Sequence, residues 1–180
     1  MKPENFRFHS TGQFRNVVKN MKTSAQFKGL DEKGEPIIDK NVPAPIVDYI
    51  GTVKTHGTNA SIILSEDGTI SFHSKNNLLG YVDTQGEFHL LSDNAEFAQT
   101  MYRRLKGVVE IVEDAKGLLS DTLRYPLKIS GEFVGQGVQK GVGVSFLPHK
   151  TFIIFGIKNG ETEQNAKQGW LPLKFTQGIC

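Results

Sequence analysis

A lysine at position 54 stands where an apolar run gives way to polar residues, in the segment Ile-Gly-Thr-Val-Lys-Thr-His-Gly-Thr-Asn-Ala at 50–60. The run before it is typical of a strand, and a strand end offers a rigid attachment with partial burial. A lysine amine is a useful nucleophile only when burial or neighbouring cations lower its pKa from about 10.4. Gly57, three residues on, lets the backbone pass close to a nucleotide. Lys54 is therefore the candidate nucleophile.

The pattern Lys-x-x-Gly carries little information by itself, because the chain contains it three times, at Lys54, Lys128 and Lys140. Lys128 falls inside an apolar run typical of a strand, and Lys140 falls in a glycine-rich loop. Only Lys54 both follows an apolar strand and precedes His-Gly-Thr-Asn, so position selects it. The alternative is a surface lysine that ends a strand.

Other motifs of nucleotide and metal chemistry are missing from the sequence. It contains no Gly-x-x-x-x-Gly-Lys-Ser/Thr loop, no Gly-x-Gly-x-x-Gly fingerprint and no His-Glu-x-x-His. The five histidines are scattered, and the single cysteine, Cys180, excludes an internal disulfide and a multi-cysteine metal site. No apolar run approaches the ~18 residues of a membrane helix. We therefore expect an intracellular, cytoplasmic protein without a membrane partner.

Four segments, in order along the chain, resemble the motifs of one enzyme family. Lys-Thr-His-Gly-Thr-Asn at 54–59 resembles motif I of ATP-dependent RNA ligases of the bacteriophage RNA ligase 2 and kinetoplastid RNA-editing ligase type, which are covalent nucleotidyltransferases. The segments at 71–76, 130–135 and 152–157 resemble the stretch after motif I, motif III and motif IIIa. Phe-Arg-Asn-Val at 14–17 is also similar to the phage enzymes. The resemblance implies a phage-like RNA repair enzyme.

The resemblance also implies a role for each matching residue. Lys54 would take AMP from ATP as a covalent phosphoramidate and pass it to an RNA 5′-phosphate, which a 3′-hydroxyl then attacks. Eight further residues would bind the nucleotide: His56, Gly57, Thr58, Asn59, Lys75, Glu132, Lys140 and Phe155. The implied partners are ATP, Mg²⁺ and nicked or single-stranded RNA ends.

Two of these residues carry specific chemistry within the implied pocket. Glu132 would bind the ribose or help to hold Mg²⁺, since a glutamate in a strand is costly to bury without a partner. Phe155 would stack on adenine, a role that suits the face of an aromatic ring. The alternative for Phe155 is ordinary core packing.

The chain departs from the family at two places. Relatives usually carry arginine at the position of Lys75, and lysine lacks the bidentate fork of arginine. After Ile157 there is no Glu-Gly pair and no Lys-x-Lys, so motifs IV and V are not found. We expect the front part of an adenylyltransferase domain, incomplete at its C-terminus. Such a chain alone should label weakly or not at all with ATP, because cations that face the phosphates are missing.

Two other functions stay open. One is a DNA ligase or a capping guanylyltransferase, although those enzymes typically have aspartate at the position of His56. The other is a non-catalytic or truncated nucleotide- or RNA-binding remnant, which the missing motifs would explain. The first thirty residues hold six basic side chains and one acidic one, so they either meet phosphates or form an ordinary solvated face.

The elements that must position these residues follow from periodicity and turn signals. Apolar spacings of three and four predict helices at 11–21 and 94–116, the second with Asp93 as cap and Glu96 completing a capping box. Short apolar runs predict strands at 47–53, 60–64, 69–73, 87–91, 127–134 and 151–157. Turn residues predict a hairpin turn at 66–68, and charge and proline at 28–45 indicate a loop or an edge excursion. These elements favour one α+β domain over 1–180 with antiparallel strands, and the resemblance implies the ligase adenylation type of nucleotidyltransferase.

Overall fold

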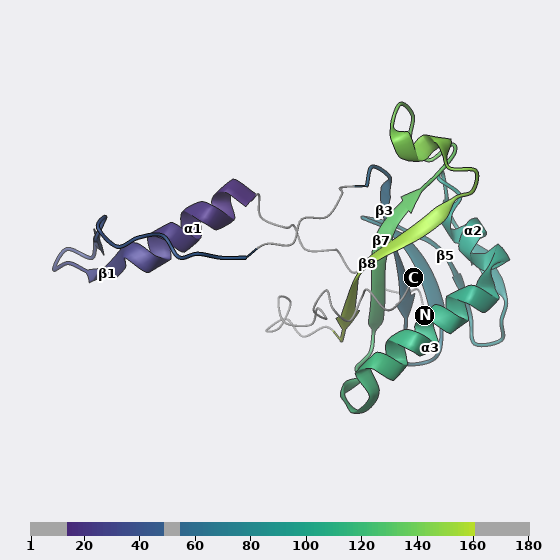
Figure 1. Ribbon diagram of the computed structural model, residues 1–180. Coiled ribbons are helices and arrows are strands. Elements are labelled where there is room, and N and C mark those ends of the chain that lie inside the picture. Colours follow the sequence, from purple (N-terminus) through teal and green to yellow (C-terminus); the bar gives the residue numbers. More distant parts are fainter. Residues whose placement is uncertain (1–13, 49–54, 161–180) are drawn as a thin grey trace. The chain divides into compact units, whose positions relative to one another are not determined.

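The computed structural model describes residues 14–48 and 55–160 of the chain (Figure 1). They belong to two compact units, an N-terminal unit within His9–Val53 and a larger unit that contains Lys54–Cys180 together with Met1–Phe8. The candidate nucleophile Lys54 and most of the strand predicted at 47–53 lie outside the described residues. Within the described ranges, no helix has the length and apolar character needed to cross a membrane.

The N-terminal unit consists of one helix and one hairpin. Helix α1 spans Phe14–Gln26 and leads directly into β1, Phe27–Leu30, which pairs antiparallel with β2, Pro36–Ile38. The Asp31 carboxylate closes the turn by accepting two backbone N–H groups, at 2.9 and 2.8 Å. The loop alternative for 28–45 is therefore wrong for these strands, which are too short and too interrupted by charge and glycine to give a period-two pattern.

The larger unit is built on a six-stranded antiparallel sheet with the order β6-β5-β4-β3-β7-β8. Its strands are β3 Thr58–Leu64, β4 Ile70–Ser74, β5 Leu78–Val82, β6 Phe88–Leu90, β7 Leu127–Val134 and β8 Thr151–Asn159. The predicted turn at 66–68 joins β3 to β4, with Gly68 at a φ of 91°. Five strands confirm predicted ones, and the antiparallel α+β class is confirmed with them.

Two helices, α2 Phe97–Arg103 and α3 Leu105–Leu119, cover one face of this sheet (Figure 1). Short 3-10 helices at Ser120–Thr122 and Gly143–Phe146 complete the described elements of the unit. The buried core between the helices and the sheet includes Ile62, Phe72, Phe97, Val108, Val112, Ile129 and Ile157. Burial of this apolar face, at roughly 25 cal/mol per Å², is the main stabilising contribution.

The helix predicted at 94–116 is in fact two helices. The chain leaves helical geometry at Arg104, where φ is −113° and ψ is 29°. Asp93 does serve the N-terminus, because its carboxylate accepts the N–H groups of Phe97 and Gln99 at 2.8 and 3.0 Å. The capping box is wrong, since Glu96 instead pairs with Lys150 at 2.7 Å.

Candidate functional site

The segments that resemble motifs I and III meet through one hydrogen bond. The backbone N–H of Gly57 donates to Oε1 of Glu132 over 3.0 Å, although 75 residues separate the two in sequence. Strand pairing places them there, because β3 and β7 align Asn59 with Glu132 and Thr58 with Phe133. The Glu132 side chain therefore holds the backbone of the loop that follows Lys54 in the sequence.

Gly57 has no room for a side chain. A Cβ at this position would clash with the backbone carbonyl oxygen of Phe133 and would lie 2.6 Å from Cγ1 of Val134. Its conformation is not in the left-handed region, so the requirement for glycine comes from close packing. Close approach of two backbones is one of the uses of glycine expected from sequence, although here the neighbour is β7.

Most predicted site residues in the described ranges come to one end of the sheet. Thr58 begins β3 where β4 ends, as the pairing of Ala60 with Ser74 requires, and Val134 at the end of β7 pairs with Thr151 at the start of β8. Lys75 follows β4 directly at this end. Antiparallel pairing thus gathers residues that lie far apart in the chain.

The remaining predicted ligands are exposed. His56 lies beside Gly57, and Lys75 and Lys140 lie in the connections that follow β4 and β7. Exposed side chains in such connections are free to reach a bound anion. Lys54 is not among the described residues, so its distance from Glu132 is not given by the structure.

Phe155 is not a core residue. It lies on β8 at an irregularity in the register with β7, where Ser130 pairs with Gly156 and Gly131 with Ile154, and it is 36% exposed. Phe152 is the ring that packs inward, with its centroid 5.2 Å from that of Phe97. Phe152 thus belongs to the packed side of β8, whereas Phe155 is partly exposed.

A polar pocket of about 170 Å³ opens at this same end, between β3, β4 and the loop that precedes α2. Its polar lining residues are Thr58, Asn59, Ser74, Asn77, Ser92, Asp93 and Asn94. The one carboxylate, Asp93, already accepts two N–H groups from the start of α2. Hydroxyl and amide groups without a cation suit a sugar or a base better than a phosphate.

The sheet face opposite the helices is polar, which sequence analysis did not predict. Six buried polar residues share it through the registers of β4, β3, β7 and β8: Ser61, Ser71, His73, Lys128, Ser130 and Lys158. Lys128 and Lys158 are cross-strand partners and only 3% and 4% exposed. Buried ammonium groups are tolerated in proteins when they have interaction partners, and neither Lys128 nor Lys158 is without one.

His73 is the most perturbed group on this face. Burial, together with the nearby Lys128 ammonium, lowers the pKa of His73 to about 4. Its Nε2 lies 2.9 Å from Oγ of Ser71, and Nδ1 has no hydrogen-bond partner among the described residues. His73 is thus neutral at pH 7. The sequence signal for this face was the alternation of polar and apolar residues along β4 and β7.

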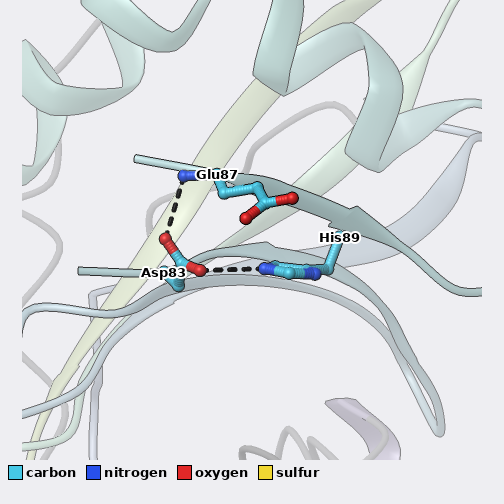
Figure 2. A group of neighbouring side chains, drawn as sticks. All are labelled: Asp83, Glu87 and His89. Atoms are coloured by element: carbon cyan, nitrogen blue, oxygen red, sulfur yellow. Dashed lines mark hydrogen bonds and ion pairs between the residues drawn. The ribbon is translucent and has the colours of Figure 1, made fainter. Parts of the chain in front are cut away.

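A separate cluster on the β5–β6 hairpin has the residue types of a metal site. Asp83, Glu87 and His89 place their ligand atoms within 4.8 Å of one another (Figure 2). Asp83 accepts backbone N–H groups of Gln85 and Glu87 and pairs with His89 Nε2 at 2.9 Å. The hydrogen bond with His89, followed by those from the backbone, holds the pKa of Asp83 below its usual value.

These contacts account for the hairpin cluster as a stabilised turn. Both Asp83 oxygens already accept hydrogen bonds, and the turn lies at the end of the sheet opposite to Gly57 and Glu132, since Val82 pairs with Ile70 at the start of β4. Glu132, the predicted metal ligand, belongs to no such cluster among the described residues.

The chain was also compared with known proteins. No protein-family model matches it, and no curated protein matches its sequence significantly.

Proposed function

We propose that this chain carries the adenylyltransferase chemistry of an ATP-dependent RNA ligase. The observation that carries the proposal is the hydrogen bond from Gly57 N–H to Glu132 Oε1. It joins the two segments whose residue types resemble motifs I and III, and in a nucleotidyltransferase these segments must share one pocket. Chance matches 75 residues apart would have no reason to meet.

The proposed reaction consists of three displacements. The neutral amine of Lys54 attacks the α-phosphorus of ATP, the N–P bond forms, pyrophosphate leaves and the amine gives up a proton. An oxygen of an RNA 5′-phosphate next attacks this phosphorus, and Lys54 leaves and is reprotonated. The RNA 3′-hydroxyl then attacks the activated 5′-phosphorus, loses its proton and expels AMP. Catalysis of this kind rests on positioning and charge neutralisation.

The described residues suit particular parts of this substrate. The exposed ring of Phe155 offers a stacking face for the base, and the hydroxyl and amide groups of the 170 Å³ pocket suit a sugar. Lys75 and Lys140 are exposed cations that can contact phosphate oxygens. Each is a single point charge, in contrast to the bidentate arginine that relatives carry at the position of Lys75.

Glu132 is compatible with a role beside Mg²⁺. One of its carboxylate oxygens accepts the Gly57 N–H, and within residues 14–48 and 55–160 no hydrogen bond is seen to the other. Mg²⁺ in nucleotide sites is commonly held by one or two carboxylates with substrate phosphates and waters, so a single glutamate fits. When bound, the ion neutralises phosphate charge.

The test is covalent labelling with ATP that is radioactive at the α-phosphate, followed by a denaturing gel. We expect weak label on the 180-residue chain, none on Lys54→Ala, and unchanged label on Lys106→Ala, a matched control in which an exposed lysine of α3 is removed. Label that survives Lys54→Ala, or label from GTP alone, would overturn the proposal.

Two substitutions separate the roles of Glu132. Glu132→Gln keeps an oxygen that accepts the Gly57 N–H but removes the charge, whereas Glu132→Ala removes both. If the carboxylate acts on a cation or on ribose, both variants should lose labelling by at least about tenfold, which corresponds to ~1.4 kcal/mol. If only Glu132→Ala loses labelling, Glu132 is a positioning residue for the Gly57 loop.

A further inference from the structure

Helix α1 carries a stripe of cations along one face. Arg15, Lys19 and Lys22 are all exposed, and their spacings of four and three residues place them on the same side of an α-helix. At 1.5 Å per residue they span roughly 10 Å along the axis. The helix contains no aspartate or glutamate, so nothing on α1 itself neutralises the stripe.

The C-terminal half of α1 contacts its own unit. Val17, Met21 and Ala25 line a groove whose far wall includes Pro45. At the end of the helix the buried side chain of Gln26 donates to the carbonyl oxygens of Lys40 and Val42, at 3.4 and 3.0 Å. These contacts attach the end of α1 to the segment after β2, whereas Arg15, Lys19 and Lys22 all stay exposed.

Two of the acidic residues of the N-terminal unit accept backbone hydrogen bonds in the segment after α1. Asp31 closes the β1–β2 turn, and Asp39 accepts the N–H of Asn41 at 3.0 Å. Among the described residues, none of the three stripe cations forms an ion pair. The charge of the stripe is therefore available to an external partner.

We propose that the face of α1 formed by Arg15, Lys19 and Lys22 binds the phosphate backbone of the RNA substrate. A row of cations a few ångströms apart matches the repeated negative charge of a nucleic acid strand, and contacts of this kind are independent of base sequence. This inference rests on the proposed function only for the identity of the polyanion as RNA.

A membrane surface is the less favoured partner. A helix that binds lipid turns its apolar side to the acyl chains and its cations to the head groups. In α1 the exposed apolar residues Phe14, Val17 and Val18 are confined to the first five residues, and Met21 and Ala25 further along are half-buried. The cations instead run from Arg15 to Lys22, so the longer exposed surface is the charged one, which suits the phosphates of a strand.

The test is the affinity of the chain for a fluorescent single-stranded RNA, measured by anisotropy over a range of salt concentrations. The variant Arg15→Gln/Lys19→Gln/Lys22→Gln should bind about tenfold more weakly at low salt, and the slope of log affinity against log salt should fall by about 2, since each phosphate contact contributes about 0.7 for single strands. The loss should be equal for RNAs of different sequence.

The matched control removes the same charge from other exposed sites, as Lys33→Gln/Lys40→Gln/Lys106→Gln. A smaller loss in this control than in the stripe variant supports the proposal. Equal losses, or no loss in the stripe variant, overturn it, as does tighter binding to phosphatidylserine vesicles than to RNA. Lys19→Glu, a single reversal at the centre of the stripe, should weaken RNA binding without altering the thermal unfolding temperature.

Labelling with ATP separates this proposal from the proposed function. The stripe variant should form the Lys54 adduct as the unchanged chain does, because the stripe contacts RNA and not ATP. If the adduct forms and RNA binding is indifferent to the stripe, only the RNA surface is wrong. If label survives Lys54→Ala yet RNA binding depends on the stripe, only the ligase chemistry is wrong.

Discussion

The two faces of the six-stranded sheet have opposite chemistry. On the face beneath α2 and α3, cross-strand neighbours such as Phe72, Ile62 and Ile129 are wholly apolar and buried. On the other face the neighbouring positions carry hydroxyl, imidazole and ammonium groups, among them His73 and Lys128. One face therefore supplies stability by apolar burial, while the other buries polar groups that need hydrogen-bond or charge partners.

The largest effect should come from the apolar face. Phe97 is completely buried, with its ring centroid 5.1 Å from that of Phe133 and 6.3 Å from that of Phe72. Phe97→Ala should lower the free energy of unfolding by about 3–5 kcal/mol, from lost burial and the resulting cavity. Chemical denaturation measures it, with Phe146→Ala as control because that ring is 86% exposed. A loss below about 1 kcal/mol would show that α2 is not packed as described.

The next largest effect should come from the polar face of the sheet, as a dependence of the free energy of unfolding on pH. His73 has a pKa of about 4 when folded and about 6.5 when unfolded, so between these values the unfolded chain binds more protons. Stability should therefore fall as pH drops from 6.5 to 4, by on the order of 3 kcal/mol, and this loss should level off below pH 4.

Unfolding free energies measured at several pH values test this dependence. His73→Leu should flatten the profile between pH 4 and 6.5, whereas His89→Gln, a change at a half-exposed histidine, should leave His73's contribution in place. Parallel profiles for His73→Leu and the unchanged chain would mean that His73 is not buried as a neutral group. Asp67 and Asp83, two of the carboxylates with lowered pKa values, titrate at still lower pH.

A third effect concerns the edge where the site lies. Gly57→Ala should displace the loop from β7, break the hydrogen bond to Glu132 and cost about 1–3 kcal/mol, as overpacking commonly does. Gly117→Ala is the matched control, because a Cβ there meets no atom within 4 Å. In a helix this change should be neutral or stabilising by up to about 1 kcal/mol. Similar unfolding free energies for both variants would contradict the close packing.

The order of polar and apolar residues predicted the strands and helices in which that order matches the burial of the side chains. The apolar run at β7 gave its bounds residue for residue, whereas β5 was missed because Gly80 interrupts it. Gly80 is tolerated because the His89 carbonyl and the Phe88 ring occupy the space of its side chain, and no local pattern reveals that. The break between α2 and α3 at Arg104 was not predicted, because the apolar residues keep their helical spacing across it.

The candidate site was predictable in part for the same reason. Motif order predicted that Lys54, Glu132 and Phe155 line one pocket, which stays a prediction because Lys54 lies outside the described residues; the structure does place Gly57 beside Glu132. The burial of Lys128 and Lys158 was not predictable, because a lysine between apolar neighbours reads equally well as an exposed strand position. Their cost depends on the register of β7 with β8, which is a property of the folded sheet.

The smallest effect on the free energy of unfolding should come from a pair of serines on the polar face of the sheet. Ser61 and Ser130 are buried cross-strand partners whose Oγ atoms lie 3.3 Å apart. Either Ser→Ala change alone should cost about 1 kcal/mol, because it leaves the other hydroxyl without this hydrogen bond. The double change should cost less than the sum of the single ones, since no unmatched hydroxyl remains. A double-mutant cycle by chemical denaturation measures this coupling, and strictly additive costs would show that each serine depends on some other partner.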